Sequence, residues 1–287
     1  MNKYAYTMKV AFLGLFLGLA PMAQADAAWT VRHLVNEQSI ISLEVTENYL
    51  LLPIQDDAPE GKIGVVKDNE LEGTFMNVRL ARERVDSYVP FALSAYKGQH
   101  VSIDIQGVPE SALCWKELKT ADTFDMTNKE SFRPVYHHTP AYGWMNDPNG
   151  MFYKDGVYHL YFQYNPYGSV WGNMHWGHST STDLAHWTFE GCAIVPDAWG
   201  AIFSGSCVVD HENTAGFGKD AIVAFYTSAK STPWGDVQAE SMAYSLDNGK
   251  TFTKYEGNPI VTSEEKDFRD PKVFWYAPGK HLSLIHI

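Results

Sequence analysis

Two stretches, WMNDPNGMFY at residues 144–153 and RDPKVFWY at residues 269–276, carry the pattern that decides the fold of this chain. Each places an Asp-Pro pair directly before an apolar run of the kind that forms a buried strand. In the first stretch, Pro148 pushes Asp147 toward an extended backbone, and Asn149-Gly150 is typical of a turn. We therefore expect Asp147 on a rigid turn that opens a strand. An ordinary surface turn is the alternative, but the large apolar pair before Asn146 weakens it.

The chain around these openings repeats a four-stranded unit. Residues 151–190 and 207–255 each hold four short strand patterns separated by turn residues, and a third set opens at Asp270. Four strands in roughly 50 residues is the size of one propeller blade. Because the first strand of each blade lines the central axis, Asp147 and Asp270 would meet at one end of it. The sequence predicts a partial β-propeller over residues 131–287, with about two complete blades; a plain β-sandwich would not bring these aspartates together.

Residues 26–130 predict a separate, small β domain, so the whole chain is expected to be all-β. Its alternating or apolar runs lie between turn residues, as in short strands. The runs are Ser39–Leu43, Tyr49–Pro53, Gly64–Val66, Thr74–Leu80 and Val101–Ile105. No catalytic constellation stands out within them.

The first 25 residues are typical of a secretory signal peptide. Lys3 and Lys9 precede the apolar run VAFLGLFLGLA at residues 10–20, which is too short to span a bilayer, and Ala23-Gln24-Ala25 fits a cleavage site. No later segment is long and apolar enough for membrane insertion. We therefore expect an exported protein, in the periplasm or outside the cell.

The charge and the composition of the chain limit the classes of molecule that it can bind. The formal net charge is −12, and loss of the two signal lysines would lower it to −14, which disfavours nucleic acid and anionic lipid. The 14% aromatic content supplies flat faces that can stack on sugar rings as well as fill a core. No metal site is predicted, because the histidines and cysteines lack ligand spacing. Cys114, Cys192 and Cys207 could form one disulfide or remain three buried thiols.

Two carboxylates that face one aromatic pocket are the equipment of glycoside hydrolysis. Arg269 precedes Asp270 and can keep a nearby carboxylate ionised or bind a sugar hydroxyl.

Five motifs in order resemble glycoside hydrolase family 32, the β-fructosidases that include invertase, levanase and inulinase. They are WMNDPNG at 144–150, YFQYNP at 161–166, WGNMHWGH at 171–178, FSGS at 203–206 and FRDP at 268–271. The resemblance covers about residues 132–277 and implies a five-bladed propeller, of which this chain holds part. It also implies that the substrate is fructan or sucrose, and that no cofactor is needed. The preceding region resembles, more weakly, the accessory domain of such enzymes in Bacteroides-like bacteria.

The resemblance assigns roles by position. Asp147 matches the nucleophile of a retaining mechanism, and Asp270 matches the transition-state stabiliser. The residues expected to bind the terminal fructose are Asn146, Gln163, Trp171, Phe203, Ser204 and Arg269. Whether levan, inulin or sucrose is preferred, and whether attack is exo or endo, stays open.

The acid/base residue of the family has no counterpart here. It is a Glu in a Glu-Cys pair beyond the FRDP motif, whereas the 16 residues after Pro271 contain no Glu. The ending LSLIHI at 282–287 does not resemble family sequence, so we expect a C-terminally truncated chain that is inactive alone. Glu190, Glu212, Glu240, Glu256, Glu264 and Glu265 do not sit in an acid/base motif.

Two other functions remain open. A non-catalytic carbohydrate-binding propeller would keep the pocket and lack the acid. An inverting propeller glycosidase for arabinan or xylan would hold its carboxylates about 6.5–9.5 Å apart, whereas a retaining enzyme needs about 5–5.5 Å.

Overall fold

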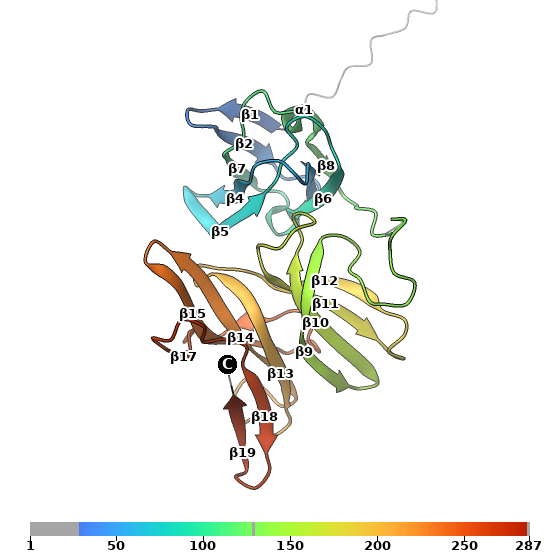
Figure 1. The fold of residues 1–287 in the computed structure, drawn as a ribbon, viewed down its shortest axis with the longest axis vertical. Coiled ribbons are helices and arrows are strands. Elements are labelled where there is room, and N and C mark those ends of the chain that lie inside the picture. Colours follow the sequence, from blue (N-terminus) through green and yellow to red (C-terminus); the bar gives the residue numbers. More distant parts are fainter. Residues whose placement is uncertain (1–28, 128–129, 286–287) are drawn as a thin grey trace, which may run out of the picture.

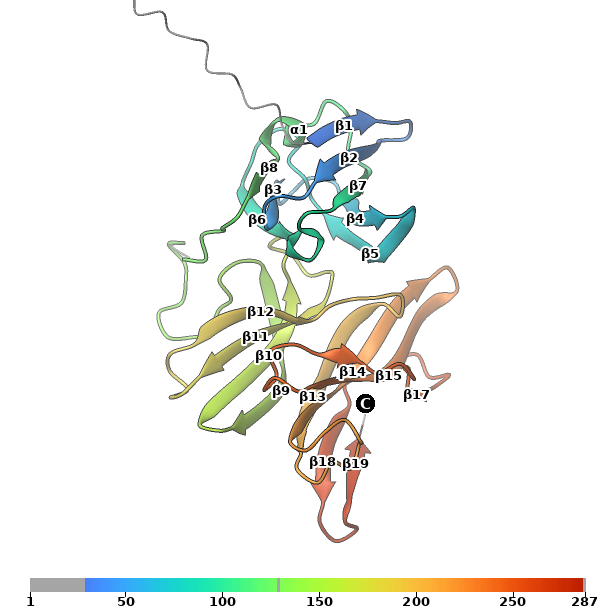
Figure 2. The same cartoon turned by 180° about the vertical axis from the view of Figure 1, so that it is seen from behind.

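The computed structural model describes residues 29–127 and 130–285, and Figures 1 and 2 show a small β domain at one end and propeller blades at the other. The predicted signal peptide lies outside the described residues. Within those residues, no helix combines the length and the hydropathy that a membrane crossing requires. The all-β fold class is confirmed, because the helical segments are confined to η1 (Ser94–Tyr96) and α1 (Cys114–Glu117) in the described chain.

The N-terminal domain consists of a five-stranded and a three-stranded antiparallel sheet around one core. Burial alternates along β2 (Gln38–Glu44), which gives that strand one apolar face, whereas β3 (Tyr49–Ile54) is buried at every position after Tyr49. Side chains such as Ile41, Leu52 and Ile103 fill the core and are fully buried. In sheet order, the strands are β1 (Trp29–His33), β2 (Gln38–Glu44), β7 (His100–Gln106), β4 (Gly61–Lys67) and β5 (Glu70–Val78), then β6 (Ser87–Ala92), β3 (Tyr49–Ile54) and β8 (Lys119–Ala121).

Two blades and the start of a third follow, as the repeat predicts. The first blade contains β9 (Trp144–Lys154), β10 (Val157–Asn165), β11 (His175–Ser181) and β12 (Thr188–Ile194). The second contains β13 (Ala201–Asp210), β14 (Ala221–Thr232), β15 (Gly235–Ser245) and β16 (Thr253–Lys254), with β17 (Val261–Thr262) also on β15. The third begins with the hairpin of β18 (Lys272–Tyr276) and β19 (His281–Ile285).

The first strands of the three sets are neighbours. β13 contacts both β9 and β18, although β9 and β18 are more than 100 residues apart in sequence. Two hydrogen bonds of Ser206 on β13 join the second and third sets: Ser206 Oγ donates to the Pro271 carbonyl and accepts from the Val273 amide, each at 2.9 Å. These inner strands therefore bring the two Asp-Pro openings to the same side of the ring.

The expectation that Asp147 lies on a turn before the strand is wrong. Asp147 is inside β9, which runs without interruption from Trp144 to Lys154. A proline is tolerated there because β9 is the edge strand of its sheet and pairs with β10 alone. The turn-forming residues instead coincide with register shifts between β9 and β10. Gly150 adopts a left-handed backbone conformation there, with φ +51°.

Candidate active site

Asp147 and Ser204 join the inner strands of the first two blades. Ser204 Oγ on β13 donates to Asp147 Oδ2 on β9 at 3.0 Å, across a sequence separation of 57 residues. The Asp147 side chain is otherwise exposed. One carboxylate oxygen is therefore oriented by a neutral donor, while the group remains accessible to a ligand.

The buried side-chain amides of Asn149 and Gln163 support the Asp147–Ser204 pair through hydrogen bonds. Asn149 has one amide orientation that suits its surroundings, in which its nitrogen donates to Ser204 Oγ at 3.2 Å and its oxygen accepts from Gln163 Nε2 at 3.0 Å. Gln163 also donates to the Ile202 carbonyl at 3.0 Å. Gln163, predicted to bind the sugar, is 3% exposed and acts here on protein groups. Asn149 was not predicted as a site residue, although it lies in the same motif as Asp147.

Two aromatic residues form a wall beside Ser204, which we call the Trp171–Phe203 wall. Their rings meet edge to face, with centroids 6.1 Å apart and planes at 74°. Trp171 is 58% exposed, so its ring is accessible to a ligand. The side chain of Asn146, also predicted to bind the sugar, accepts a hydrogen bond from Trp144 Nε1 at 2.9 Å.

Asp270 has a backbone conformation that few residues with a side chain adopt. Its φ is +63°, and its amide donates to Thr227 Oγ1 at 2.9 Å. Burial raises the pKa of its carboxyl, Arg269 lowers it, and the negative charge of Asp147 raises it again. The roles predicted for Asp147 and Asp270 stay predictions.

Arg269 is held beside Asp270 without a tight ion pair to it. Its Nε lies 3.8 Å from Asp270 Oδ2, while its Nη1 binds Asp267 Oδ1 at 2.6 Å and Gln238 Oε1 at 3.5 Å. The guanidinium is thus anchored mainly by Asp267 and Gln238, and Nε is the Arg269 nitrogen that lies near the Asp270 carboxylate.

Glu240 is a buried carboxyl that sequence reasoning set aside. Thr227 Oγ1 donates to Glu240 Oε2 at 3.0 Å, and the side chain is fully buried. Burial, opposed by the Thr227 bond and reinforced by the charge of Asp270, raises its pKa to about 7. The pairing of Thr227 with Glu240 across β14 and β15 creates this contact, and no motif in the sequence announces it.

The described residues include no cluster of three or more metal-ligating side chains. The paired histidines serve the aromatic core of the first blade: His159 Nδ1 lies 3.1 Å from His178 Nε2, and Phe152 stacks on His159 at 4.3 Å. Burial lowers the pKa of His178 to about 3, so its ring stays neutral. All three cysteines are free thiols, so the predicted alternative of one disulfide is wrong. Cys114 and Cys207 are buried, whereas Cys192 is exposed, so the alternative of three buried thiols holds for two of the three.

Comparison with known proteins places this arrangement in a family. The model of the glycosyl hydrolases family 32 N-terminal domain matches residues 137–286, just over half of the chain. That match includes β19 and corrects the expectation that the final residues are foreign to the family. A domain of unknown function, DUF4980, matches residues 35–136, whereas the suggested Bacteroides-type accessory domain stays a prediction.

The relatives share the propeller half of this chain at high identity. The levanase of Bacillus subtilis is 54% identical over 160 residues, covering 54% of this chain and 23% of the relative. Invertase 1 of Saccharomyces cerevisiae is 50% identical over 165 residues, covering 54% and 30% respectively. The solved β-fructofuranosidase of Schwanniomyces occidentalis complexed with fructosyl-erythritol is 48% identical, with a TM-score of 0.50, covering 54% of this chain and 31% of that one. The chain thus spans about a quarter to a third of these relatives.

Proposed function

The chain belongs to glycosyl hydrolase family 32, and on that premise we propose that it supplies the first blades of an exported, retaining glycoside hydrolase that releases fructose from β-fructosides. The relatives are named levanase, invertase and exo-inulinase, which supports fructan or sucrose as the substrate. The single observation that carries the proposal is the accessible Asp147 carboxylate, oriented by Ser204 beside an exposed aromatic wall.

In this mechanism Asp147 is the nucleophile. The oxygen not bound to Ser204 attacks the anomeric carbon as the glycosidic C–O bond breaks, and the product is a fructosyl ester on Asp147. Water then cleaves that ester and restores the carboxylate. Asp270 stabilises the positive charge that develops on the ring and accepts hydrogen bonds from sugar hydroxyls. Asn146 and Arg269 border the sugar together with the Trp171–Phe203 wall. Gln163 holds Asn149 in place, and Asn149 in turn donates to Ser204 Oγ.

The acid that protonates the leaving oxygen is proposed to lie outside this chain. Glu240 is unsuited to the role, because it is fully buried and its carboxyl is bound to Thr227. The short coverage of the relatives supports the same conclusion. We propose the corresponding division into a signal peptide at 1–25, a β domain at 26–130 and a partial propeller at 131–287.

Replacement of the nucleophile tests the function. The product of the complete open reading frame should release fructose from levan, inulin or sucrose, and Asp147→Asn should reduce kcat by at least ~10³-fold with folding unchanged. Asp155→Asn is the matched control, because it makes the same change in the β9–β10 turn, where Asp155 is exposed. Turnover by Asp147→Asn at the wild-type rate would remove the nucleophile from the mechanism.

Two further measurements on the complete protein distinguish the proposed enzyme from a carbohydrate-binding propeller and from an inverting glycosidase. Sugar binding without hydrolysis by the complete protein would indicate a carbohydrate-binding propeller. NMR of the first-formed anomer distinguishes retention from inversion, and inversion would contradict the covalent intermediate.

A further inference from the structure

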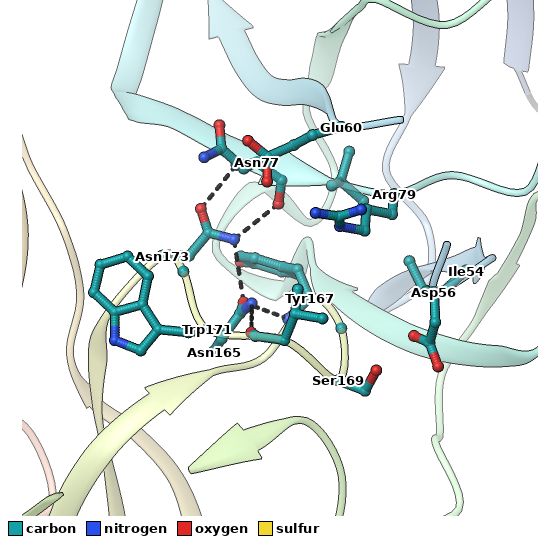
Figure 3. A pocket seen from close by; sticks show the side chains of 14 residues that line it. Ile54, Asp56, Glu60, Asn77, Arg79, Asn165, Tyr167, Ser169, Trp171 and Asn173 are labelled. Atoms are coloured by element: carbon teal, nitrogen blue, oxygen red, sulfur yellow. Dashed lines mark hydrogen bonds between the residues drawn. The ribbon is translucent and has the colours of Figure 1, made fainter. Parts of the chain in front are cut away.

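The loop between β10 and β11, residues 166–174, reaches from the first blade to the N-terminal domain (Figure 3). Asn173 forms a two-point contact there: its Oδ1 accepts from the Asn77 amide and its Nδ2 donates to the Asn77 carbonyl, each at 2.8 Å. Asn77 lies on β5, the edge strand of its sheet. The side-chain amide therefore takes the place of a neighbouring strand on an edge that would otherwise be open.

A second anchor lies at the start of the loop. The ring of Tyr167 packs on Phe91 with centroids 5.7 Å apart, and it joins the hydrophobic core of the N-terminal domain from outside. The loop is thus attached to that domain by an apolar contact near one end and a polar contact near the other. Such a pair of anchors fixes both position and orientation.

Asn165 braces the loop between these anchors. Its Oδ1 accepts from the Tyr167 amide at 3.0 Å and from Asn173 Nδ2 at 3.1 Å, and its Nδ2 donates to the Val170 carbonyl at 2.8 Å. Asn165 is 3% exposed, so these bonds are protected from water. Figure 3 shows this network between Asn173, Asn165 and the domain above.

Trp171 lies between the brace and the sugar-binding side. It is two residues from Asn173 and one from Val170, and its ring meets Phe203, the neighbour of Ser204. Any displacement of the loop therefore moves one half of the Trp171–Phe203 wall. An exposed Trp on an untethered loop would have to be ordered by the ligand, which lowers affinity.

We propose that the N-terminal domain is a positioning element for the sugar-binding site: through Asn173 and Tyr167 it holds the 166–174 loop so that Trp171 stands ready against Phe203. This inference rests on the proposed function for its sugar ligand, but the clamp itself does not. It gives a role to a domain whose family match carries none. Asn173 and Tyr167 are positioning residues, since they act on substrate through Trp171.

The test replaces one amide on each side of the contact. Asn173→Asp keeps the shape and the tolerance for the left-handed backbone, here φ +44°, but removes the Nδ2 donor from Asn77 and Asn165. Asn77→Asp is the matched control, because it adds the same charge at the interface while Asn77 contributes only backbone atoms to the clamp. In the complete protein we expect Asn173→Asp to raise KM for the fructoside about 10-fold with kcat within about 2-fold, and Asn77→Asp to leave both unchanged.

A double-mutant cycle shows whether the effect passes through Trp171. In a Trp171→Ala background, Asn173→Asp should raise KM no further. An equal rise in both backgrounds would overturn the proposal.

Hydrogen–deuterium exchange tests the clamp without a substrate. Amides of 166–174 should exchange about 10-fold faster in Asn173→Asp than in the wild type or Asn77→Asp. Unchanged exchange overturns the clamp, whereas faster exchange in a protein that hydrolyses no β-fructoside contradicts only the proposed function.

Discussion

The amide of Asp270 donates to the hydroxyl of Thr227 at 2.9 Å, and this bond holds Asp270 in a left-handed conformation. The same hydroxyl donates onward to buried Glu240 at 3.0 Å. A residue with a Cβ pays a conformational penalty of roughly 1–2 kcal/mol in this region of the backbone. The hydrogen bonds of Thr227 and Glu240 therefore offset part of the conformational penalty at Asp270.

Removal of the Thr227 hydroxyl should disturb this chain of bonds. Thr227→Val is similar in shape but leaves the Asp270 amide and the Glu240 carboxyl unpaired, which costs ~1–3 kcal/mol of stability. We expect kcat/KM to fall at least ~10-fold as Asp270 loses its orientation. Urea unfolding and steady-state kinetics measure the two effects. Thr227→Ser keeps the hydroxyl and should stay close to wild type; equal losses in both variants would contradict the bond as the cause.

The raised pKa of Glu240 predicts that the free energy of unfolding falls as the pH rises. Its folded pKa of about 7 exceeds the ordinary value of 4.5 for a glutamate, so the folded state holds the proton more tightly than the unfolded state. The stabilisation is complete below pH 4.5 and is lost as pH rises through 7. Glu240→Gln removes the titration, so its advantage over wild type should grow by up to ~3 kcal/mol between pH 4.5 and 8. Unfolding free energies with parallel pH profiles would contradict this account.

Ser204 should affect the chemical step more than substrate binding. Ser204→Ala removes the donor that orients Asp147 Oδ2, and a hydrogen bond to a charged group contributes about 1.5–3 kcal/mol. We expect kcat to fall at least ~10-fold with a small change in KM. Ser231→Ala is the control, since it removes a Ser–Asp bond of 2.7 Å on the exposed β14–β15 hairpin. A pure KM effect would assign Ser204 to sugar binding instead.

Gly205 is required for the approach of β13 to β14. A Cβ at this position would lie 2.0 Å from the Phe225 carbonyl oxygen, so the two backbones would have to separate. We expect Gly205→Ala to lower the unfolding free energy by about 2–4 kcal/mol and to displace Ser204. Gly156→Ala, in a turn with open space around the Cβ, should cost only about 1–2 kcal/mol for its left-handed backbone. Similar losses at both glycines would argue against the close approach as the cause.

Much of the fold followed from local pattern. Alternation and turn residues predicted the two sets of four short strands at 151–190 and 207–255, because strand periodicity and turn chemistry act over a few residues. The place of Asp147 was misjudged, since an Asp-Pro-Asn-Gly sequence indicates a turn unless the strand it enters is an edge. That edge is a property of the sheet and not of the segment.

The sequence by itself determined the all-β class, the blade repeat and the motifs that carry Asp147 and Asp270. Only the tertiary structure decided that Ser204 orients Asp147, that Thr227 joins Asp270 to Glu240, and that Asn173 fastens the Trp171 loop to the N-terminal domain. The physical reason is the distance along the chain over which each interaction acts. Periodicity and turn preferences are written in neighbouring residues, whereas these hydrogen bonds depend on strand register and on contacts between separate sheets.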